Sequence, residues 1–225
     1  MINVIIPSAG KGRRFSKNKP KQFFKIGNKE IILINLEKWL KIKEVNRIYL
    51  VLPDENFDNL KKKYENVDSK IFAIKGGNTR SESIYNAVKL INEDNEFTFI
   101  HDGARPFFKI EIIDKLLKEL KFCDAVIPAL KLTDTIKKIN GNRIVETVNR
   151  DDYVRVQTPQ AFRTKIIKNV YERVSLKENY FDDAQLLEKE GLEVCFIEGD
   201  KENIKITEPQ DMAFAEFLYG KDGIL

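Results

Sequence analysis

Positive charge is concentrated in one short segment near the amino terminus. Between residues 11 and 25 the sequence has seven basic side chains and no Asp or Glu: Lys11, Arg13, Arg14, Lys17, Lys19, Lys21 and Lys25. The whole chain of 225 residues has a formal net charge of only +4, so the remainder is slightly acidic. A local cluster of this kind is typical of a single anion-binding loop, and a solvated Lys-rich loop is the competing interpretation.

The residues that flank this cluster favour anion binding. A short apolar run at 3–7 leads into small residues and glycines, which let backbone N–H groups approach a phosphate. The sequence is neither a Walker A loop nor G-x-G-x-x-G, because the required Ser/Thr and the third glycine are missing. We expect phosphate groups to be bound by the residues of this turn: Pro7, Ser8, Ala9, Gly10 and Gly12.

Two further polar segments follow predicted strands. The segment 76–80 contains two glycines that could hold a base or ribose by backbone contacts, although a tight turn before a helix has the same composition. Asp102 follows another apolar run, and its carboxylate could bind a ribose or Mg²⁺, or could simply pair with Arg105. His101, the single histidine, is expected to pack at the strand end rather than act as a base. One histidine also excludes a multi-His metal site.

These residue types together predict phosphoryl transfer. Clustered cations and one strand-end carboxylate suit a reaction that depends on positioning and charge neutralisation. A substrate phosphate would attack the α-phosphate of a nucleoside triphosphate, and pyrophosphate would leave. Such a reaction needs no covalent side-chain nucleophile.

The elements that must position these residues form an α/β pattern. Short β-branched runs predict strands at 3–7, 47–53, 70–75, 97–101 and 124–129. Helical spacing predicts helices at 30–44, at 54–66, after a capping box at Thr79 and Glu82, and around 113–120. Alternation of this kind implies a Rossmann-like, mostly parallel sheet with helices on both faces. Ligands bind beyond the carboxyl ends of such strands, so the three polar segments should meet at one edge.

The alternation is interrupted between 131 and 155. Asn140-Gly141, a strong hairpin signal, separates the predicted strands 135–139 and 143–148. We expect a β-arm that projects from the sheet and either covers a site or contacts a second subunit. Beyond it we predict helices at 164–175 and 183–190, strands at 193–197 and 203–206, and a last helix from Thr207 capped by Gln210. Residues 1–225 are expected to form a single nucleotidyltransferase domain, with 131–155 as its β-arm.

The composition is that of an ordinary globular protein, with 42% hydrophobic and 33% charged residues. No apolar run approaches the roughly 18 residues that a membrane span needs, and the first residues lack a basic signal-peptide region. We therefore expect a cytoplasmic protein without membrane contact. Cys123 and Cys195, the two cysteines, each have apolar neighbours and are expected to be reduced core thiols.

The sequence resembles the 2-C-methyl-D-erythritol 4-phosphate cytidylyltransferases over essentially its whole length. Nine short motifs carry the resemblance in chain order: Ala9-Gly10-x-Gly12-x-Arg14, Pro20-Lys21-Gln22, Gly76-Gly77-x-x-Arg80-x-x-Ser83, His101-Asp102-Gly103-Ala104-Arg105-Pro106, Asp134-Thr135-Ile136-Lys137, Thr147-Val148-x-Arg150, Thr158-Pro159-Gln160-x-Phe162, Asp182-Asp183-Ala184 and Asn203-Ile204-Lys205-Ile206-Thr207. The chain departs from the family at Ser8, where alanine is usual, and at Gln185, where serine is common. Neither departure removes a charge that the reaction needs.

The resemblance implies roles for individual residues. Arg14 and Lys21 would be catalytic and stabilise charge at the α-phosphate of CTP, while the turn from Pro7 to Gly12 holds the triphosphate. The base and ribose would be bound by Gly77, Asn78, Ser83 and Gly103. The polyol phosphate would be positioned by Thr135, Arg150, Lys205, Asp102 and Arg105. Asp102 would also lie next to Mg²⁺ or another divalent cation. Because the family forms homodimers through its arms, Arg150 would serve the partner subunit's site.

Three alternatives remain open. A ribitol 5-phosphate cytidylyltransferase has a similar fold and CTP site, although the sequence Gly103-Ala104-Arg105-Pro106 favours the methylerythritol enzyme. A nucleic-acid-binding module would use the basic segment, but the rest of the chain is slightly acidic and has no recognisable aromatic stacking platform. A non-catalytic nucleotide sensor would not need to retain Arg14, Lys21 and Lys205.

Overall fold

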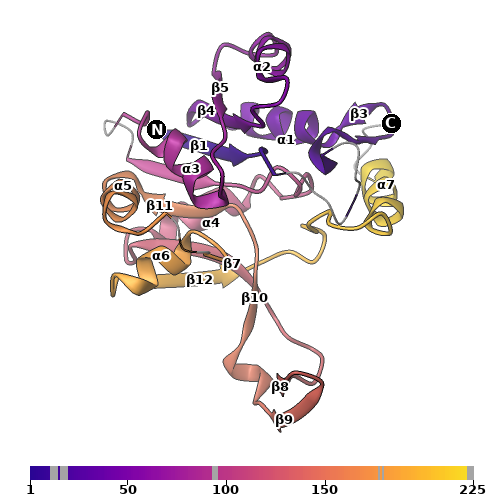
Figure 1. Cartoon of the computed structure of the whole chain (residues 1–225), viewed down its shortest axis with the longest axis vertical. Helices are drawn as coiled ribbons and strands as arrows, with labels where there is room; N and C mark the ends of the chain where they lie inside the picture. Colours follow the sequence, from indigo (N-terminus) through magenta and orange to yellow (C-terminus); the bar gives the residue numbers. More distant parts are fainter. Residues whose placement is uncertain (11–14, 16–19, 93–95, 177, 179, 222–225) are drawn as a thin grey trace.

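An eight-stranded sheet forms the centre of the computed structural model, which describes residues 1–10, 15, 20–92, 96–176, 178 and 180–221. The strand order is β10-β7-β11-β6-β1-β4-β5, and β12 also pairs with β7 (Figure 1). The strands of this sheet are β1 (Ile2–Pro7), β4 (Val45–Leu52), β5 (Ile71–Lys75), β6 (Phe97–Ile100), β7 (Ala125–Lys131), β10 (Val154–Val156), β11 (Gln160–Arg163) and β12 (Val194–Glu198).

The sheet is mostly parallel, as predicted. β1 pairs in parallel with β4 and β6, β4 with β5, and β7 with β12. β10 and β11 are the antiparallel members. They were not predicted, because each has only three or four residues and contains polar or charged side chains that hide the strand pattern.

Helices cover both faces of the sheet. On one face, α1 (Ile31–Leu40), α2 (Phe57–Glu65) and α4 (Ile112–Glu119) contribute Trp39, Tyr64 and Leu116 to one core. On the other face, α3 (Arg80–Val88), α5 (Thr164–Arg173) and α6 (Ala184–Lys189) form a second core. Successive residues of β1 divide between the two cores, because strand side chains alternate between faces.

The carboxyl-terminal part differs from the prediction in two places. Residues 203–206 form no strand, because they cross the end of the sheet and hydrogen bond to loops. The last helix, α7 (Asp211–Lys221), begins four residues later than expected. The Asp211 carboxylate, rather than Gln210, accepts hydrogen bonds from the backbone N–H groups of Thr207 and Glu208. α7 packs on a small hairpin, β2 (Lys25–Ile26) and β3 (Lys29–Glu30), which the sequence pattern did not reveal.

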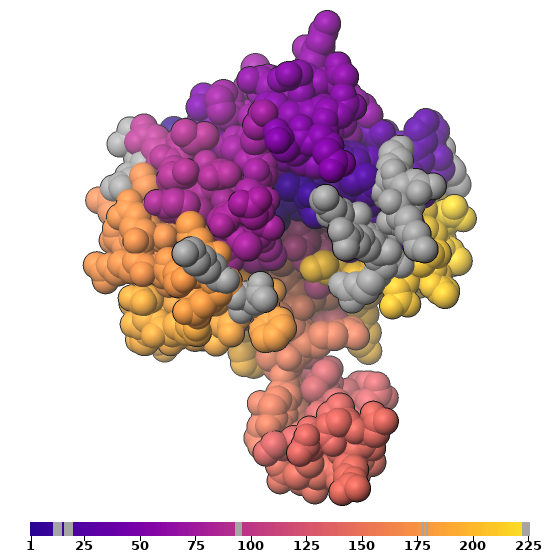
Figure 2. All heavy atoms as spheres, in the orientation of Figure 1, coloured from indigo at the N-terminus to yellow at the C-terminus, as the bar shows by residue number. Residues whose placement is uncertain are grey.

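The predicted β-arm is present. β8 (Lys137–Asn140) and β9 (Arg143–Thr147) pair only with each other among the described residues, and all their residues are exposed. Gly141 has a φ of +55°, the left-handed conformation that a tight hairpin turn requires. The hairpin stands away from the rest of the molecule (Figures 1 and 2).

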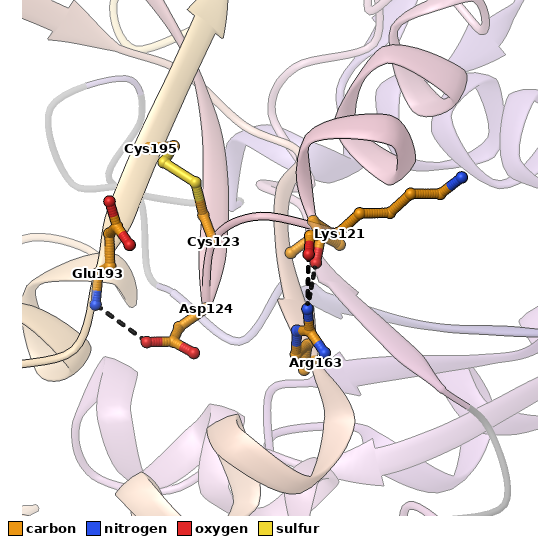
Figure 3. Close-up of a disulfide and its surroundings, with 7 residues drawn as sticks. Lys121, Cys123, Asp124, Arg163, Glu193 and Cys195 are labelled. Carbon is orange, nitrogen blue, oxygen red and sulfur yellow. Dashed lines mark hydrogen bonds between the residues drawn. A yellow bond between two sulfur atoms is a disulfide. The ribbon is translucent and has the colours of Figure 1, made fainter.

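The two cysteines are joined in a disulfide, so the prediction of reduced thiols is wrong for this structure (Figure 3). The reason lies in the sheet: β12 pairs with β7 so that Cys195 is opposite Val126, three residues after Cys123. The two Cα atoms are 6.0 Å apart, within the range that a disulfide bridges. Within the described ranges, no helix is long and apolar enough to cross a membrane.

Candidate active site

A pocket of about 470 Å³ lies at the carboxyl ends of the parallel strands. The turns that follow β1, β5 and β6 meet there, as the parallel topology requires, and the 203–206 segment adds Lys205. The lining residues are Pro7, Ser8, Ala9, Gly10, Lys21, Gln22, Gly77, Asn78, Thr79, Arg80, Ser83, Asp102, Gly103, Ala104 and Lys205.

Two glycines allow these turns to approach one another closely. A Cβ atom at Gly76 would overlap the Cβ atom of Ala9, and one at Gly103 would overlap the Oγ atom of Ser8. The turn after β1 therefore touches the turns after both β5 and β6. This close contact brings segments that are distant in the sequence into a single pocket.

The turn after β1 is also held by Gln22. This side chain is buried, and its Nε2 group donates hydrogen bonds to the backbone carbonyls of Ser8 and Gly10. It belongs to the 3-10 turn η1 (Lys21–Phe23), so Lys21 is placed at the pocket wall. The predicted site residues Gly12 and Arg14 lie outside the described residues.

The turn after β5 is shaped by a helix cap. Thr79 Oγ1 accepts a 3.0 Å hydrogen bond from the backbone N–H of Glu82, which confirms the predicted cap of α3. Ser83 Oγ accepts a hydrogen bond from the Gly77 N–H at 3.0 Å and donates one to the Thr79 carbonyl at 2.8 Å. The Glu82 carboxylate accepts one from the Asn78 N–H at 2.7 Å. Ser83 therefore also sets the conformation of the turn.

Asp102 is the charged centre of the pocket. Its Oδ2 atom is 2.8 Å from Lys205 Nζ and 3.6 Å from Arg105 Nε. Burial opposes ionisation, but the positive charges of Lys205, Arg80 and Arg105 outweigh it and hold the pKa of Asp102 well below its usual range. Asp102 is therefore a carboxylate at neutral pH.

Lys205 reaches Asp102 because its segment is tied to the sheet. The Ile206 N–H donates to the Ala104 carbonyl at 2.9 Å, and the Arg105 guanidinium donates to the Asn203 carbonyl at 2.8 Å. Asn203 Nδ2 in turn donates to the Thr158 carbonyl at 2.8 Å. Arg105 thus supports this wall of the pocket from behind rather than lining it.

His101 packs at the strand end, as predicted. It is fully buried, in contact with the rings of Trp39 and Phe108. Its ring nitrogens lie 3.1 Å from Thr158 Oγ1 and 2.9 Å from the Arg105 carbonyl. Burial lowers the pKa of His101 to about 3, so the ring is neutral and structural.

Arg80 is a lining residue that we did not single out as a site residue. Its guanidinium forms two hydrogen bonds with the Asp183 carboxylate, at 3.1 and 2.5 Å, and the Asp183 side chain has no exposed surface. Tyr171 Oη also donates to Asp183, at 2.6 Å. Arg80 and Asp183 each belong to a motif of the family. Their pairing is not visible in a single sequence, because the two residues are 103 positions apart.

Thr135 and Arg150 do not line this pocket. Both are exposed residues of the arm region, and Arg150 donates a hydrogen bond to the Thr133 carbonyl. Within one chain, the pocket thus brings together the predicted nucleotide-binding residues that the structure describes, together with Lys21, Asp102 and Lys205. Thr135 and Arg150 lie outside it.

An open α/β sheet with a small-residue turn and cations at its carboxyl edge defines a nucleotide-binding class of protein. A family model described as 2-C-methyl-D-erythritol 4-phosphate cytidylyltransferase matches residues 2–221. The chain belongs to this family and is therefore a nucleotidyltransferase.

Individual relatives agree with this assignment. The chain is 37% identical to the 2-C-methyl-D-erythritol 4-phosphate cytidylyltransferase of Bacillus thuringiensis (strain Al Hakam), covering 97% of this chain and 98% of the relative. Its fold is similar to the crystal structure of 4-diphosphocytidyl-2C-methyl-D-erythritol synthase from Anaerococcus prevotii, with a TM-score of 0.84, 32% identity and coverage of 98% and 96%. It is also similar to the Francisella tularensis cytidylyltransferase, with a TM-score of 0.80, 31% identity and coverage of 96% and 98%.

Proposed function

We propose that the pocket joins CTP and 2-C-methyl-D-erythritol 4-phosphate, giving 4-diphosphocytidyl-2-C-methyl-D-erythritol and pyrophosphate. This is the activity of the family, in non-mevalonate isoprenoid biosynthesis. The observation that carries the proposal for this chain is the meeting of the three strand-end turns with Lys21, Arg80, Asp102 and Lys205 in one pocket.

The nucleotide occupies the part of the pocket formed by the strand-end turns. The backbone of Pro7, Ser8, Ala9 and Gly10, with Gly12, binds the triphosphate. The turn containing Gly77 and Asn78, in the conformation that Ser83 sets, binds cytosine, and Gly103 lies beside the ribose. The support for this arrangement is the contact of all three turns around one space of nucleotide size.

The polyol phosphate binds on the Lys205 side of the pocket. Lys205 attracts the phosphate, Asp102 orients the substrate, and Arg105 holds the segment that carries Lys205. Thr135 and Arg150 complete the site from the arm of a partner subunit in a homodimer. The support for this last step is that both residues are exposed on the arm and do not line the pocket of their own chain.

The reaction is a direct displacement. A phosphate oxygen of the acceptor attacks the α-phosphorus of CTP, a new P–O bond forms, and the bond to the β-phosphate breaks to release pyrophosphate. Lys21 and Arg14 stabilise the charge that develops on the α-phosphate, so the chain contributes mainly electrostatic stabilisation and positioning.

Asp102 fits a role beside a divalent cation. The two ion pairs that described residues make with this carboxylate both use the Oδ2 atom. No described cation therefore pairs with the Oδ1 atom and competes there with a divalent cation. One carboxylate together with phosphate oxygens suits Mg²⁺, which would neutralise triphosphate charge when bound. The low pKa of Asp102 keeps the ligand ionised.

The acceptor is tested by offering purified protein CTP and Mg²⁺ with either 2-C-methyl-D-erythritol 4-phosphate or ribitol 5-phosphate, and by measuring pyrophosphate release. We expect release with the methylerythritol substrate and little with ribitol 5-phosphate. Release with ribitol 5-phosphate alone would overturn the assignment of the acceptor. Silence with both acceptors would overturn the proposed activity of this chain. A cytoplasmic location and the absence of nucleic-acid binding remain predictions.

A further inference from the structure

The disulfide lies at the edge of the sheet opposite the nucleotide pocket. Cys123 is two residues before β7, and Cys195 is the second residue of β12, so both mark the amino ends of their strands. β12 is parallel to β7, which has the same direction as β6 because β11 is antiparallel to both. The pocket is at the carboxyl ends, so the cysteines take no part in nucleotidyl transfer.

A carboxylate lies beside the two sulfur atoms. Glu193 is exposed, and one carboxylate oxygen and both Sγ atoms lie within 4.8 Å of one another (Figure 3). Of the described residues, no other group of three or more His, Cys, Asp or Glu side chains is close enough to hold a metal ion.

The backbone fixes these three residues relative to one another. The Glu193 N–H donates to Asp124 Oδ2 at 3.0 Å, and the Glu193 carbonyl accepts from the N–H groups of Asp124 and Ala125 at 3.1 and 3.2 Å. Cys123 is buried and its N–H donates to the carbonyl of Glu119, the last residue of α4, at 3.3 Å, and Cys195 belongs to the β7–β12 ladder. The backbone segments that carry the three ligands are therefore tied to each other by hydrogen bonds and strand pairing.

The set of donor atoms is selective for soft cations. Two thiolates and one carboxylate suit Zn²⁺ or a similar thiophilic ion, which binds sulfur at about 2.3 Å and prefers four ligands. Water can supply the fourth ligand, since Glu193 is exposed. Mg²⁺, which prefers oxygen ligands, has little affinity for such a site.

The disulfide and the metal-bound state exclude each other. A dithiol reductant supplies two electrons and two protons, is itself oxidised to a disulfide, and leaves two thiols at Cys123 and Cys195. A divalent cation then displaces both thiol protons as it binds. Oxidation by a disulfide reverses the first step and releases the cation.

We propose that reduced Cys123 and Cys195, together with Glu193, form a binding site for one thiophilic divalent cation, and that the disulfide is the oxidised, metal-free state of this site. The proposal is independent of the assigned nucleotidyl transfer. It makes the amino edge of the β7–β12 pair a redox-dependent metal site that is separate from the nucleotide pocket.

The test is titration of the intact, reduced protein with Zn²⁺, and with Cd²⁺ as a spectroscopic probe, in buffer without reductant or oxygen. We expect one equivalent to bind per chain, with thiolate-to-Cd²⁺ charge-transfer absorption that excess Mg²⁺ does not remove. The oxidised protein should bind none at this site. Equal binding by reduced wild type and the C123S/C195S variant would overturn the proposal.

Single variants test two of the three ligands separately. Cys195→Ser should abolish the stoichiometric binding, and Glu193→Gln should weaken it about tenfold or more. Glu198→Gln removes an exposed carboxylate from the other end of β12 and serves as the matched control, with unchanged binding. Unchanged affinity of Glu193→Gln would contradict the assignment of the third ligand.

A measurement on the wild-type chain removes any dependence on the folding of the variants. These are the only two cysteines in the sequence, so alkylation by iodoacetamide reports on this site alone. Stoichiometric Zn²⁺ should protect both thiols of the reduced protein from alkylation. Alkylation at the same rate with and without Zn²⁺ would overturn the proposal.

Discussion

Lys21 is the cation on which the account of catalysis depends most among the described residues. Replacement by alanine should lower kcat by about a hundredfold or more, because the variant lacks the positive charge that stabilises the negative charge developing on the α-phosphate. The thermal unfolding temperature should hardly change, since Lys21 is only half-buried. Lys25→Ala, an exposed lysine from the same basic segment, is the matched control. Equal kcat values for the two variants would refute the catalytic role of Lys21.

His101 should make the stability of the protein depend on pH. Its pKa is about 3 in the folded protein and returns to its ordinary value of 6.5 on unfolding. Between these values the unfolded chain binds a proton that the folded chain does not. The free energy of unfolding therefore falls as the pH falls, by up to about 1.4 kcal/mol per pH unit.

Urea unfolding between about pH 5 and about pH 7 measures this slope. The His101→Gln variant should have a shallower slope, whatever its absolute stability, because its side chain does not titrate. Parallel slopes for the variant and the wild type would show that the pKa of His101 is not lowered by folding.

The hydroxyl group of Ser8 is buried without a hydrogen bond to any described residue. Ser8→Ala should raise the free energy of unfolding, by up to about 1 kcal/mol, since it removes an unpaired hydroxyl. Ser83→Ala should instead lower it by about 1 kcal/mol, because Ser83 makes two internal hydrogen bonds. Chemical denaturation of both variants provides the comparison, and destabilisation by Ser8→Ala would contradict the interpretation.

For individual residues, the sequence indicates which residue types meet at the pocket, but not which side chains pair with one another. The cations, the strand-end Asp102 and the small residues after β1 are visible as local patterns, and topology predicts that they converge. The pair formed by Arg80 and Asp183 is not visible, because it depends on packing between α3 and the start of α6. The same is true of Gln22, whose polar side chain gives no sign that it will be buried.

Among the elements, those with a strong local signal were predicted best. The alternating helices and parallel strands were confirmed to within a few residues, as was the hairpin around Asn140-Gly141. β10 and β11 were missed because tertiary pairing with β6 and β7, rather than side-chain periodicity, defines them. The disulfide was missed for a similar reason, since only the β7–β12 register brings the cysteines together.

The segment 203–206 shows how an apolar pattern can mislead. The alternation of apolar and polar residues predicts a strand. In the structure, however, Ile206 is buried beside α7, and Asn203 is buried with its side chain hydrogen-bonded to the Thr158 carbonyl. The segment crosses the end of the sheet instead of joining it. The structural consequence is that Lys205 reaches Asp102.

The arm leads to a prediction about subunit exchange that rests on the proposed homodimer. Mixing Arg150→Ala subunits with Lys21→Ala subunits should restore part of the lost activity, because a hybrid of the proposed dimer would have one site with an intact Lys21 and an intact Arg150 from the partner. Activity is compared for each variant alone and for the mixture after the two proteins have exchanged subunits. Complete absence of recovery, in a mixture shown to contain hybrid dimers, would mean that each site is built within one chain.

The whole molecule combines a nucleotide pocket at one edge of the sheet with an arm that projects from it. The family assignment, the convergence of the strand-end turns and the charge balance around Asp102 all favour transfer of the cytidylyl group without a covalent enzyme intermediate. In the proposed reaction, the fold would provide the binding surfaces for the two substrates, and the cations that line the pocket would stabilise the developing charge.

The most direct test follows the α-phosphate of CTP. Purified protein is incubated with Mg²⁺ and CTP labelled at the α-phosphate, with and without 2-C-methyl-D-erythritol 4-phosphate, and the label is traced in protein, nucleotide and product. We predict that the label enters 4-diphosphocytidyl-2-C-methyl-D-erythritol only when the acceptor is present, together with one pyrophosphate for each product, and never becomes attached to the chain. Failure to transfer the label to the acceptor, or a labelled protein formed without it, would contradict the account.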